Sequence, residues 1–80
     1  MSPRLRFLHA ESSLNRVKLE QFREFDSLEL KASLRPGQAG SLKVRPDGTV
    51  LDGHHRLSIL RERGEDIDRL PRETFVKEAL

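Results

Sequence analysis

A strand pattern, a turn pattern and a helix pattern follow one another without a gap in the middle of the chain, and this order constrains the fold most. Leu42 and Val44 alternate with charged residues, which indicates a half-buried strand. The Pro-Asp-Gly sequence at 46–48 predicts a hairpin, because proline fixes φ, aspartate forms an Asx turn and glycine accepts a positive φ. Residues 49–51 then form the return strand and lead directly into Gly53.

After Gly53 the spacing of apolar residues becomes helical. Leu57, Ile59 and Leu60 share one broad arc of a helix, and Gly64 stands where a left-handed residue would end it. The order of these patterns predicts an α+β domain. We expect a short mixed or antiparallel sheet with a β-hairpin and two or three helices.

The turn into this helix has the pattern of an anion site, formed by Gly53, His54, His55 and Arg56. The first amides of a helix have no internal partners, and the helix dipole is positive there. Glycine removes the side chain that would keep an anion at a distance. Residues of the first turn can lean over the helix end, so all three polar side chains can donate to one phosphate. Arg56 is the strongest donor because its guanidinium is always charged.

Arg56 also has a structural interpretation. On the helical wheel it lies between Ile59 and Leu60, so its stem runs along the face that packs on the core. The side chain would then pass the edge of the sheet and pair with a carboxylate such as Asp52 or an acid of the first helix. The two roles are compatible. Of the two histidines, His54 is expected to be the more exposed, and for each of them a hydrogen-bonded structural role is the alternative.

The first third of the chain gives weaker patterns. Residues 1–13 show no sustained periodicity and are expected to form a flexible N-terminal arm, with 14–80 as a single domain. The alternation over 17–21 predicts a short extended segment. Phe22 and Phe25, which follow it, are expected to be core anchors.

A capping box and a final strand complete the prediction. Asp26 is followed three residues later by glutamate, which is typical of a helix start. We expect a helix over 27–34 that buries Leu28 and Leu34 and stops before a proline-glycine pair. A last short strand is predicted over 74–76.

Length and composition limit the class of protein. The chain has 80 residues, of which 35% are hydrophobic, enough for one modest core. It has no cysteine, which excludes disulfides, thiolate metal sites and cysteine nucleophiles and fits a reducing compartment. No apolar run approaches the roughly 20 residues that span a bilayer, and no signal peptide is recognisable, so a cytoplasmic protein without a membrane partner is expected. The balance of 15 basic against 13 acidic residues gives little indication of a nucleic-acid surface.

Metal binding and catalysis receive limited support from the residues. Asp52, His54 and His55 are adjacent, but adjacent histidines do not share a helix face, so no transition-metal site is predicted. A magnesium ion carried in with a nucleotide fits better, with Asp52 as its ligand or, alternatively, as the cap of the helix. No serine has a recognisable base near it in sequence, so catalytic residues are not identified. A catalytic carboxylate would have to be one of Glu20, Glu24, Asp26 and Glu29.

The run over 44–64 resembles the phosphate-binding box of the ParB/sulfiredoxin superfamily, whose members are also called ParB-like nuclease domains. These proteins carry Gly-x-x-Arg at a strand-to-helix turn, matched here by Gly53 and Arg56. They use it on nucleotide phosphates, CTP in ParB and ATP in sulfiredoxin and the free serine kinases. The family's first box is similar to residues 30–34, Gly37 and 42–44.

The resemblance implies a sulfiredoxin-like fold with ATP or CTP and Mg²⁺ as ligands. His54 stands where sulfiredoxin has its catalytic cysteine, so that activity is not expected. The DNA-binding and dimerisation domains of ParB have no counterpart in these residues. Two functions remain. One is a nucleotide-dependent phosphotransferase or hydrolase that uses residues 53–56. The other is a non-catalytic nucleotide- or DNA-binding module of a partition or regulatory system, acting with a protein partner or as a homodimer.

Overall fold

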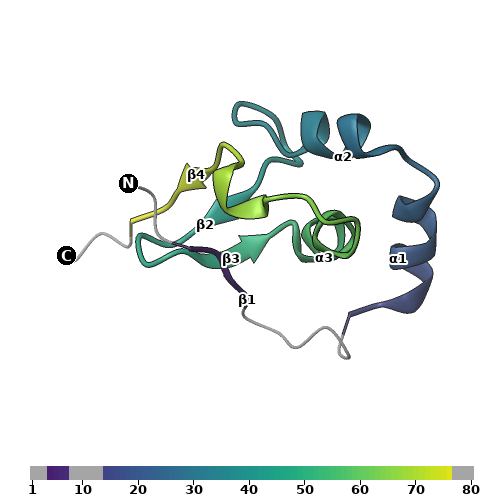
Figure 1. Ribbon diagram of the computed structural model, residues 1–80. Coiled ribbons are helices and arrows are strands. Elements are labelled where there is room, and N and C mark those ends of the chain that lie inside the picture. Colours follow the sequence, from purple (N-terminus) through teal and green to yellow (C-terminus); the bar gives the residue numbers. More distant parts are fainter. Residues whose placement is uncertain (1–3, 8–13, 77–80) are drawn as a thin grey trace.

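A computed structural model describes residues 4–7 and 14–76. It is an α+β fold in which one four-stranded mixed sheet packs against helices, as the sequence predicts. In Figure 1, α3 lies between the sheet and α1, and α2 lies above them. The elements in chain order are β1 (Arg6–Phe7), α1 (Arg16–Arg23), α2 (Ser27–Ser33), β2 (Lys43–Val44), β3 (Thr49–Asp52), α3 (His54–Glu62), the 3₁₀ helix η2 (Ile67–Arg69) and β4 (Glu73–Thr74).

The predicted hairpin forms the centre of the sheet. The strand order is β1-β3-β2-β4, with β2 and β3 antiparallel and both outer strands parallel to their neighbours. The Asx turn is present, because Asp47 Oδ1 accepts the amide of Thr49 at 2.9 Å. Gly48 has a φ of 91°, which few residues other than glycine adopt. The last strand begins one residue earlier than expected, and Phe75 donates its amide to the Val44 carbonyl.

Part of the predicted arm belongs to the sheet. Arg6 and Phe7 pair with Thr49 and Val50 as a parallel edge strand, and Leu5 and Phe7 pack against the core. The Leu5 amide also donates to Asp68 Oδ1 at 2.8 Å. This corrects the expectation of a flexible arm for these residues, because a two-residue strand is too short to show a period. Residues 1–3 and 8–13 of the predicted arm lie outside the described residues.

The extended segment predicted over 17–21 is wrong, because these residues lie in helix α1. Asn15 caps the helix by accepting the amides of Val17 and Lys18. Leu19 and Phe22, three positions apart, pack against the core from one helix face. Val17 is instead 67% exposed. The alternation that indicated a strand therefore arises from residues on different sides of a helix.

Phe25, the second expected core anchor, is 45% exposed. Its ring still contacts that of Phe22, with centroids 6.4 Å apart and the planes inclined by 45°. Only Phe22 of the pair reaches the core cluster. Phe25 follows the end of α1, so its side chain covers the edge of the core rather than its interior.

Helix α2 begins as predicted but buries a different leucine. Asp26 and Glu29 form the capping box, in which each side chain accepts the other's backbone amide. Leu34 is buried, as expected, whereas Leu28 is 77% exposed and Leu30 is buried in its place. Leu30 and Leu34 are four residues apart and therefore share a face, while Leu28 points away from it.

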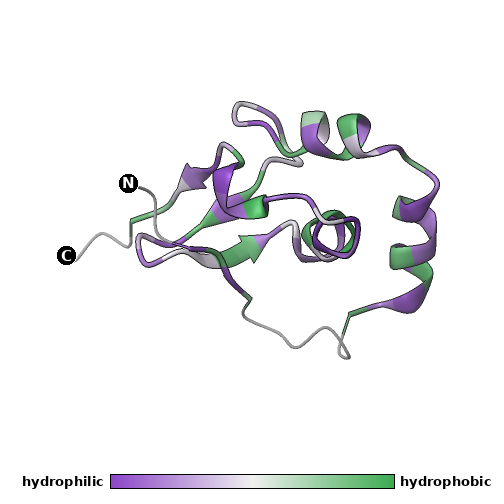
Figure 2. Ribbon diagram, in the orientation of Figure 1, coloured by the Kyte–Doolittle hydropathy of each residue, from purple (hydrophilic) through white to green (hydrophobic). Residues whose placement is uncertain are grey.

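Helix α3 carries the largest share of the core. Leu57, Ile59 and Leu60 are buried as predicted, and Ser58 is buried as well. The helix ends in a Schellman motif, since the amides of Gly64 and Glu65 bond back to the carbonyls of Arg61 and Leu60. In Figure 2, hydrophobic colouring marks much of β2 and β3, whereas α3 shows both hydrophobic and hydrophilic residues. The buried core consists of Leu30, Leu34, Leu42, Val44, Val50, Leu57, Ile59, Leu60 and Ile67.

Polar contacts connect α1 and α2 to the end of α3. Arg23 bonds Glu62 at 2.9 Å, and Arg63 donates to the Ser27 hydroxyl and to the Arg23 carbonyl. These contacts orient α1 and the start of α2 around the end of α3.

Among the residues that the structure describes, no helix has the length and apolar character needed to cross a membrane.

The exposure of the two leucines in α2 gives a matched test of the packing. Leu30→Ala should lower the free energy of unfolding by about 2–5 kcal/mol, because it removes buried methyl groups and leaves a cavity. Leu28→Ala makes the same chemical change on an exposed surface and should change it by less than about 0.5 kcal/mol. Urea unfolding of both variants measures the difference. Equal effects would show that α2 is rotated relative to this arrangement.

Candidate functional site

The strand-to-helix turn is built around Gly53. Its φ of 105° lies in the left-handed region, and it is the N-cap residue of α3. A Cβ atom here would lie 3.0 Å from Leu34 Cδ2, so both the backbone angle and the close packing require glycine. Among the described residues no side chain caps α3, and its first turn contains no acidic residue. The positive end of the helix dipole is therefore not neutralised by a side-chain cap.

Asp52 does not cap the helix. It is the last residue of β3, one position before the N-cap, and its side chain is 53% exposed. Its Oδ2 atom lies 3.8 Å from Lys43 Nζ across the hairpin. The prediction of a capping role is wrong because Gly53 occupies that position, whereas a role for Asp52 in binding magnesium stays a prediction.

Arg56 is buried at the centre of the site, with only 8% of its surface exposed. Its Nη1 atom donates to the carbonyl and the hydroxyl of Ser33, at 3.2 and 3.1 Å. Its Cζ atom lies 5.7 Å from the centre of the Phe22 ring, in a cation-π arrangement. The guanidinium thus contacts the end of α2 and one side of α1, and it forms no ion pair with a carboxylate of the described residues.

Two glycines lie beside this guanidinium, and Gly40 leaves room for it. A Cβ at Gly40 would lie 3.3 Å from Nη1, and one at Gly53 would lie 3.9 Å from Nη2. Nη2 is therefore on the side of the guanidinium that faces the turn. None of the described residues accepts a hydrogen bond from Nη2 or Nε, so these residues use only part of the donor capacity of Arg56.

The charge of Arg56 persists despite its burial. Burial lowers the pKa of the guanidinium, and the nearby Asp52 carboxylate acts in the opposite direction. An arginine starts from so high a pKa that it stays protonated at neutral pH. The Ser33 carbonyl at the end of α2 faces this charge, and such carbonyls carry partial negative charge. The site therefore combines a permanent cation with the uncapped start of α3.

The two histidines have the opposite exposure to that expected. His54 is buried and meets the ring of Phe7 edge-on, with centroids 5.8 Å apart. His55 is only partly buried, and its Nε2 atom accepts the backbone amide of Asn15 at 3.1 Å. The prediction that His54 is the more exposed histidine is wrong, because β1 covers it. Both imidazoles contact neighbouring elements, so the amides and Arg56 are better placed than the histidines to hold an anion.

Hydrogen bonding also fixes the protonation state of His55. Its Nε2 atom must carry a lone pair to accept an amide, so the ring is neutral in this contact. Burial lowers the pKa of His55, and the positive charges of Lys18 and Arg56 lower it further. His55 therefore links the start of α1 to the start of α3 in its neutral form.

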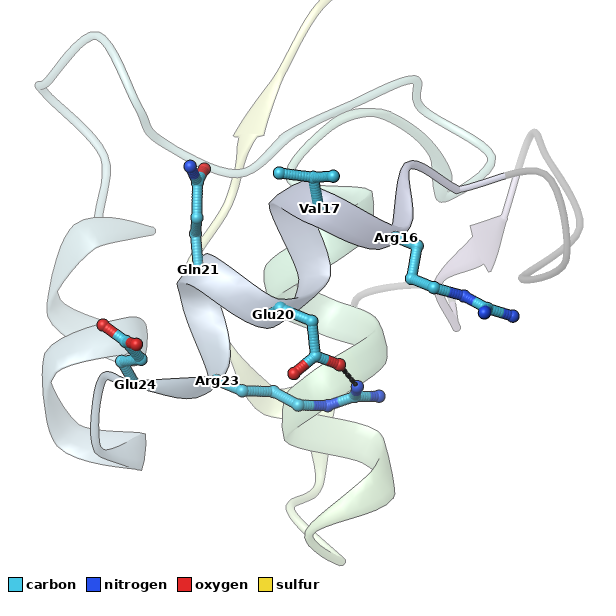
Figure 3. Close-up of a pocket in the computed structure, with 6 residues that line it drawn as sticks. All are labelled: Arg16, Val17, Glu20, Gln21, Arg23 and Glu24. Atoms are coloured by element: carbon cyan, nitrogen blue, oxygen red, sulfur yellow. Dashed lines mark hydrogen bonds and ion pairs between the residues drawn. The ribbon is translucent and has the colours of Figure 1, made fainter.

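The acidic residues considered for catalysis contact other groups. Glu20 pairs with Arg23 at 2.6 Å in the shallow hollow over α1 shown in Figure 3, and Arg23 also binds Glu62 at the far end of α3. Asp26 and Glu29 form the capping box of α2. No hydrogen bond or ion pair among the described residues joins these carboxylates, or Glu24, to residues 53–56.

A second polar cluster beside the site was not predicted. The buried Ser41 hydroxyl donates to Glu73, which also accepts the Gly37 amide at 3.4 Å. The bond from Ser41 lowers the pKa of Glu73. Lys43 Nζ donates to the Ala39 carbonyl and to Ser41 Oγ. The cluster holds the loop at 37–41, which includes Gly40, in place against Arg56.

The described residues contain no group of three or more histidine, aspartate or glutamate side chains that could hold a metal ion.

The sequence matches no family model, and no curated protein or solved structure shows significant similarity to it. The resemblance to the ParB/sulfiredoxin superfamily is therefore carried by the residues of the sequence alone.

Two glycines with positive φ separate the effects of backbone angle and packing. Both Gly53→Ala and Gly64→Ala introduce a left-handed alanine, which costs about 1–2 kcal/mol. Gly53→Ala should destabilise the protein by more, because only its new methyl group also meets Leu34. No atom lies within 4 Å of a Cβ at Gly64. Thermal unfolding of the two variants measures the difference. Equal losses would contradict the close approach of Leu34.

The contact of His55 predicts a pH dependence of stability. Its pKa is below 6.5 in the folded protein and returns to about 6.5 on unfolding. The unfolded state therefore binds more protons as the pH falls below 6.5, and the free energy of unfolding decreases. His55→Gln keeps an acceptor for the Asn15 amide but does not titrate. Urea unfolding from pH 7.5 to 5 should show a steeper loss in the wild type, whereas parallel curves would rule out this role.

Proposed function

We propose that the protein binds the phosphate groups of a nucleotide at the start of α3. The observation that carries this proposal is a buried arginine with donors on the side facing Gly53 that bond no acceptor among the described residues. A buried charge is costly unless something compensates it, and an anion at the turn would compensate Arg56 more fully than Ser33 does. The uncapped first turn adds backbone amides and the helix dipole at the same point.

A nucleotide with Mg²⁺ suits the groups around this turn. The amides after Gly53 and the Nη2 atom of Arg56 bind one phosphate. Asp52, exposed at the end of β3, is the adjacent carboxylate that could bind the magnesium ion that accompanies ATP or CTP. The Gly-x-x-Arg pattern and its resemblance to the ParB/sulfiredoxin superfamily support a nucleotide over a simple anion.

Binding without catalysis is the function these residues support best. Glu20, Asp26 and Glu29 have partners away from the turn, so none of them is positioned to activate a nucleophile there. The protein would then act as a nucleotide-dependent module for a partner protein, DNA or a second copy of itself. Phosphotransfer or hydrolysis is the second candidate, favoured by Asp52, the exposed carboxylate beside the turn.

Titration calorimetry with Mg-ATP and Mg-CTP tests the proposal. Arg56→Met keeps much of the apolar stem but removes the charge, and should weaken binding about tenfold or more, because a charge-assisted hydrogen bond is lost. Arg69→Met is the matched control, since the Arg69 side chain is 88% exposed and its ion pair among the described residues is with Asp66. It should leave the affinity unchanged.

A second variant keeps the test valid if Arg56→Met unfolds. His55→Glu places a negative charge in the first turn of α3. This charge stabilises the helix by interacting with its dipole, but it repels phosphate. It should fold and bind more weakly. Wild-type affinity in both variants, or no binding to the wild type, would refute the proposal. Phosphate release that Asp52→Asn abolishes would identify the enzyme rather than the module.

A further inference from the structure

A small apolar pocket lies between the end of α1 and helix α2. It is lined by Phe22, Phe25, Glu29, Leu30 and Ser33. Phe25, one of the four phenylalanines of the chain, is 45% exposed. An aromatic ring left half open at the mouth of an apolar pocket offers a surface for another flat ring.

The pocket shares two walls with the surroundings of Arg56. The Phe22 ring lies 5.7 Å from the guanidinium carbon, and Ser33 accepts two hydrogen bonds from Nη1. The opposite nitrogen, Nη2, lies toward Gly53. Phe22 and Ser33 therefore contact both the pocket and Arg56. A ligand with a ring at one end and phosphates at the other would place the ring against Phe22 and a phosphate beside Nη2.

Glu29 is the only charged group that lines this pocket. Its Oε1 atom is used in the capping box, where it accepts the Asp26 amide at 3.5 Å. A carboxylate has two oxygens and about four acceptor positions, so it can accept further hydrogen bonds. In a pocket with apolar walls, such an acceptor favours a ligand that carries a donor and disfavours one that carries a carbonyl.

We propose that this pocket holds the base of the nucleotide and selects bases with an exocyclic amino group. The inference rests on the proposed function, since the phosphates of the same molecule bind at the start of α3. The base stacks on Phe25, and its amino group donates to the Glu29 carboxylate. Adenine, cytosine and guanine carry such a group, whereas uracil presents a carbonyl oxygen instead.

Calorimetry with four probes tests the base pocket separately from the phosphate site. Mg²⁺ complexes of ATP, CTP, UTP and inorganic tripolyphosphate are titrated into the whole chain. ATP and CTP should bind more tightly than UTP and tripolyphosphate. Phe25→Ala should weaken ATP binding about tenfold, in the range expected for loss of one stacked base, and leave the affinity for tripolyphosphate unchanged. Phe75→Ala, which removes a phenylalanine 50% exposed beside β4, should change neither.

Glu29→Gln provides the second readout. Glutamine also forms a capping box, so α2 is retained, but its amide can present a donor to the pocket. The preference for ATP over UTP should fall at least fivefold. Equal binding of ATP and tripolyphosphate, or equal effects of Phe25→Ala and Phe75→Ala, would overturn the base pocket while leaving the phosphate site intact. Absence of binding by all four probes would overturn the proposed function and the base pocket with it.

Discussion

The hydrogen bonds between Arg56 and Ser33 are the interaction on which the rest of the site depends. They join the first turn of α3 to the last residue of α2, and the same guanidinium contacts Phe22 of α1. A carbonyl at the end of one helix thereby faces a cation at the start of another. The apolar core holds these helices against the sheet, but the buried arginine fixes how their ends meet. At Gly40 the guanidinium occupies the space that a Cβ atom would need, whereas Gly53 is required by its positive φ and by the close approach of Leu34.

Local patterns predicted the central part of the fold. The hairpin turn at Asp47, the capping box at Asp26 and the helix stop at Gly64 each depend on residues within a few positions, so the sequence contains the whole signal. The alternation over 17–21 does not distinguish a strand from helix α1, because a run of eight residues can fit both periods, and the cap at Asn15 is the local signal that indicates a helix. The edge strand β1 could not be predicted, since two residues show no period and their partners are far along the chain.

The sequence proposes the residues of an anion site, whose role stays a prediction, but it does not predict how the structure arranges them. Helix geometry alone places the glycine at the start of the helix axis and the arginine on the side that faces the core. A helical wheel does not show what covers each position, and so it gave His54 and His55 the wrong exposures. The cluster of Ser41 and Glu73 joins residues 32 positions apart, and no spacing rule connects them. Such contacts depend on the sheet order, which only the structure provides.

The sheet order also has a consequence for how the chain can reach this fold. The strand nearest each end of the described chain pairs with one side of the hairpin, and Leu5 bonds to Asp68 across 63 positions. A chain emerging from the ribosome can form the hairpin and α3 early, yet it cannot complete the sheet until residue 74 is free. Contacts between such distant positions slow folding, because a large loop must close before they stabilise anything. During that interval both sides of the hairpin are open edges, which makes this the stage at which the chain is most prone to pair with another copy.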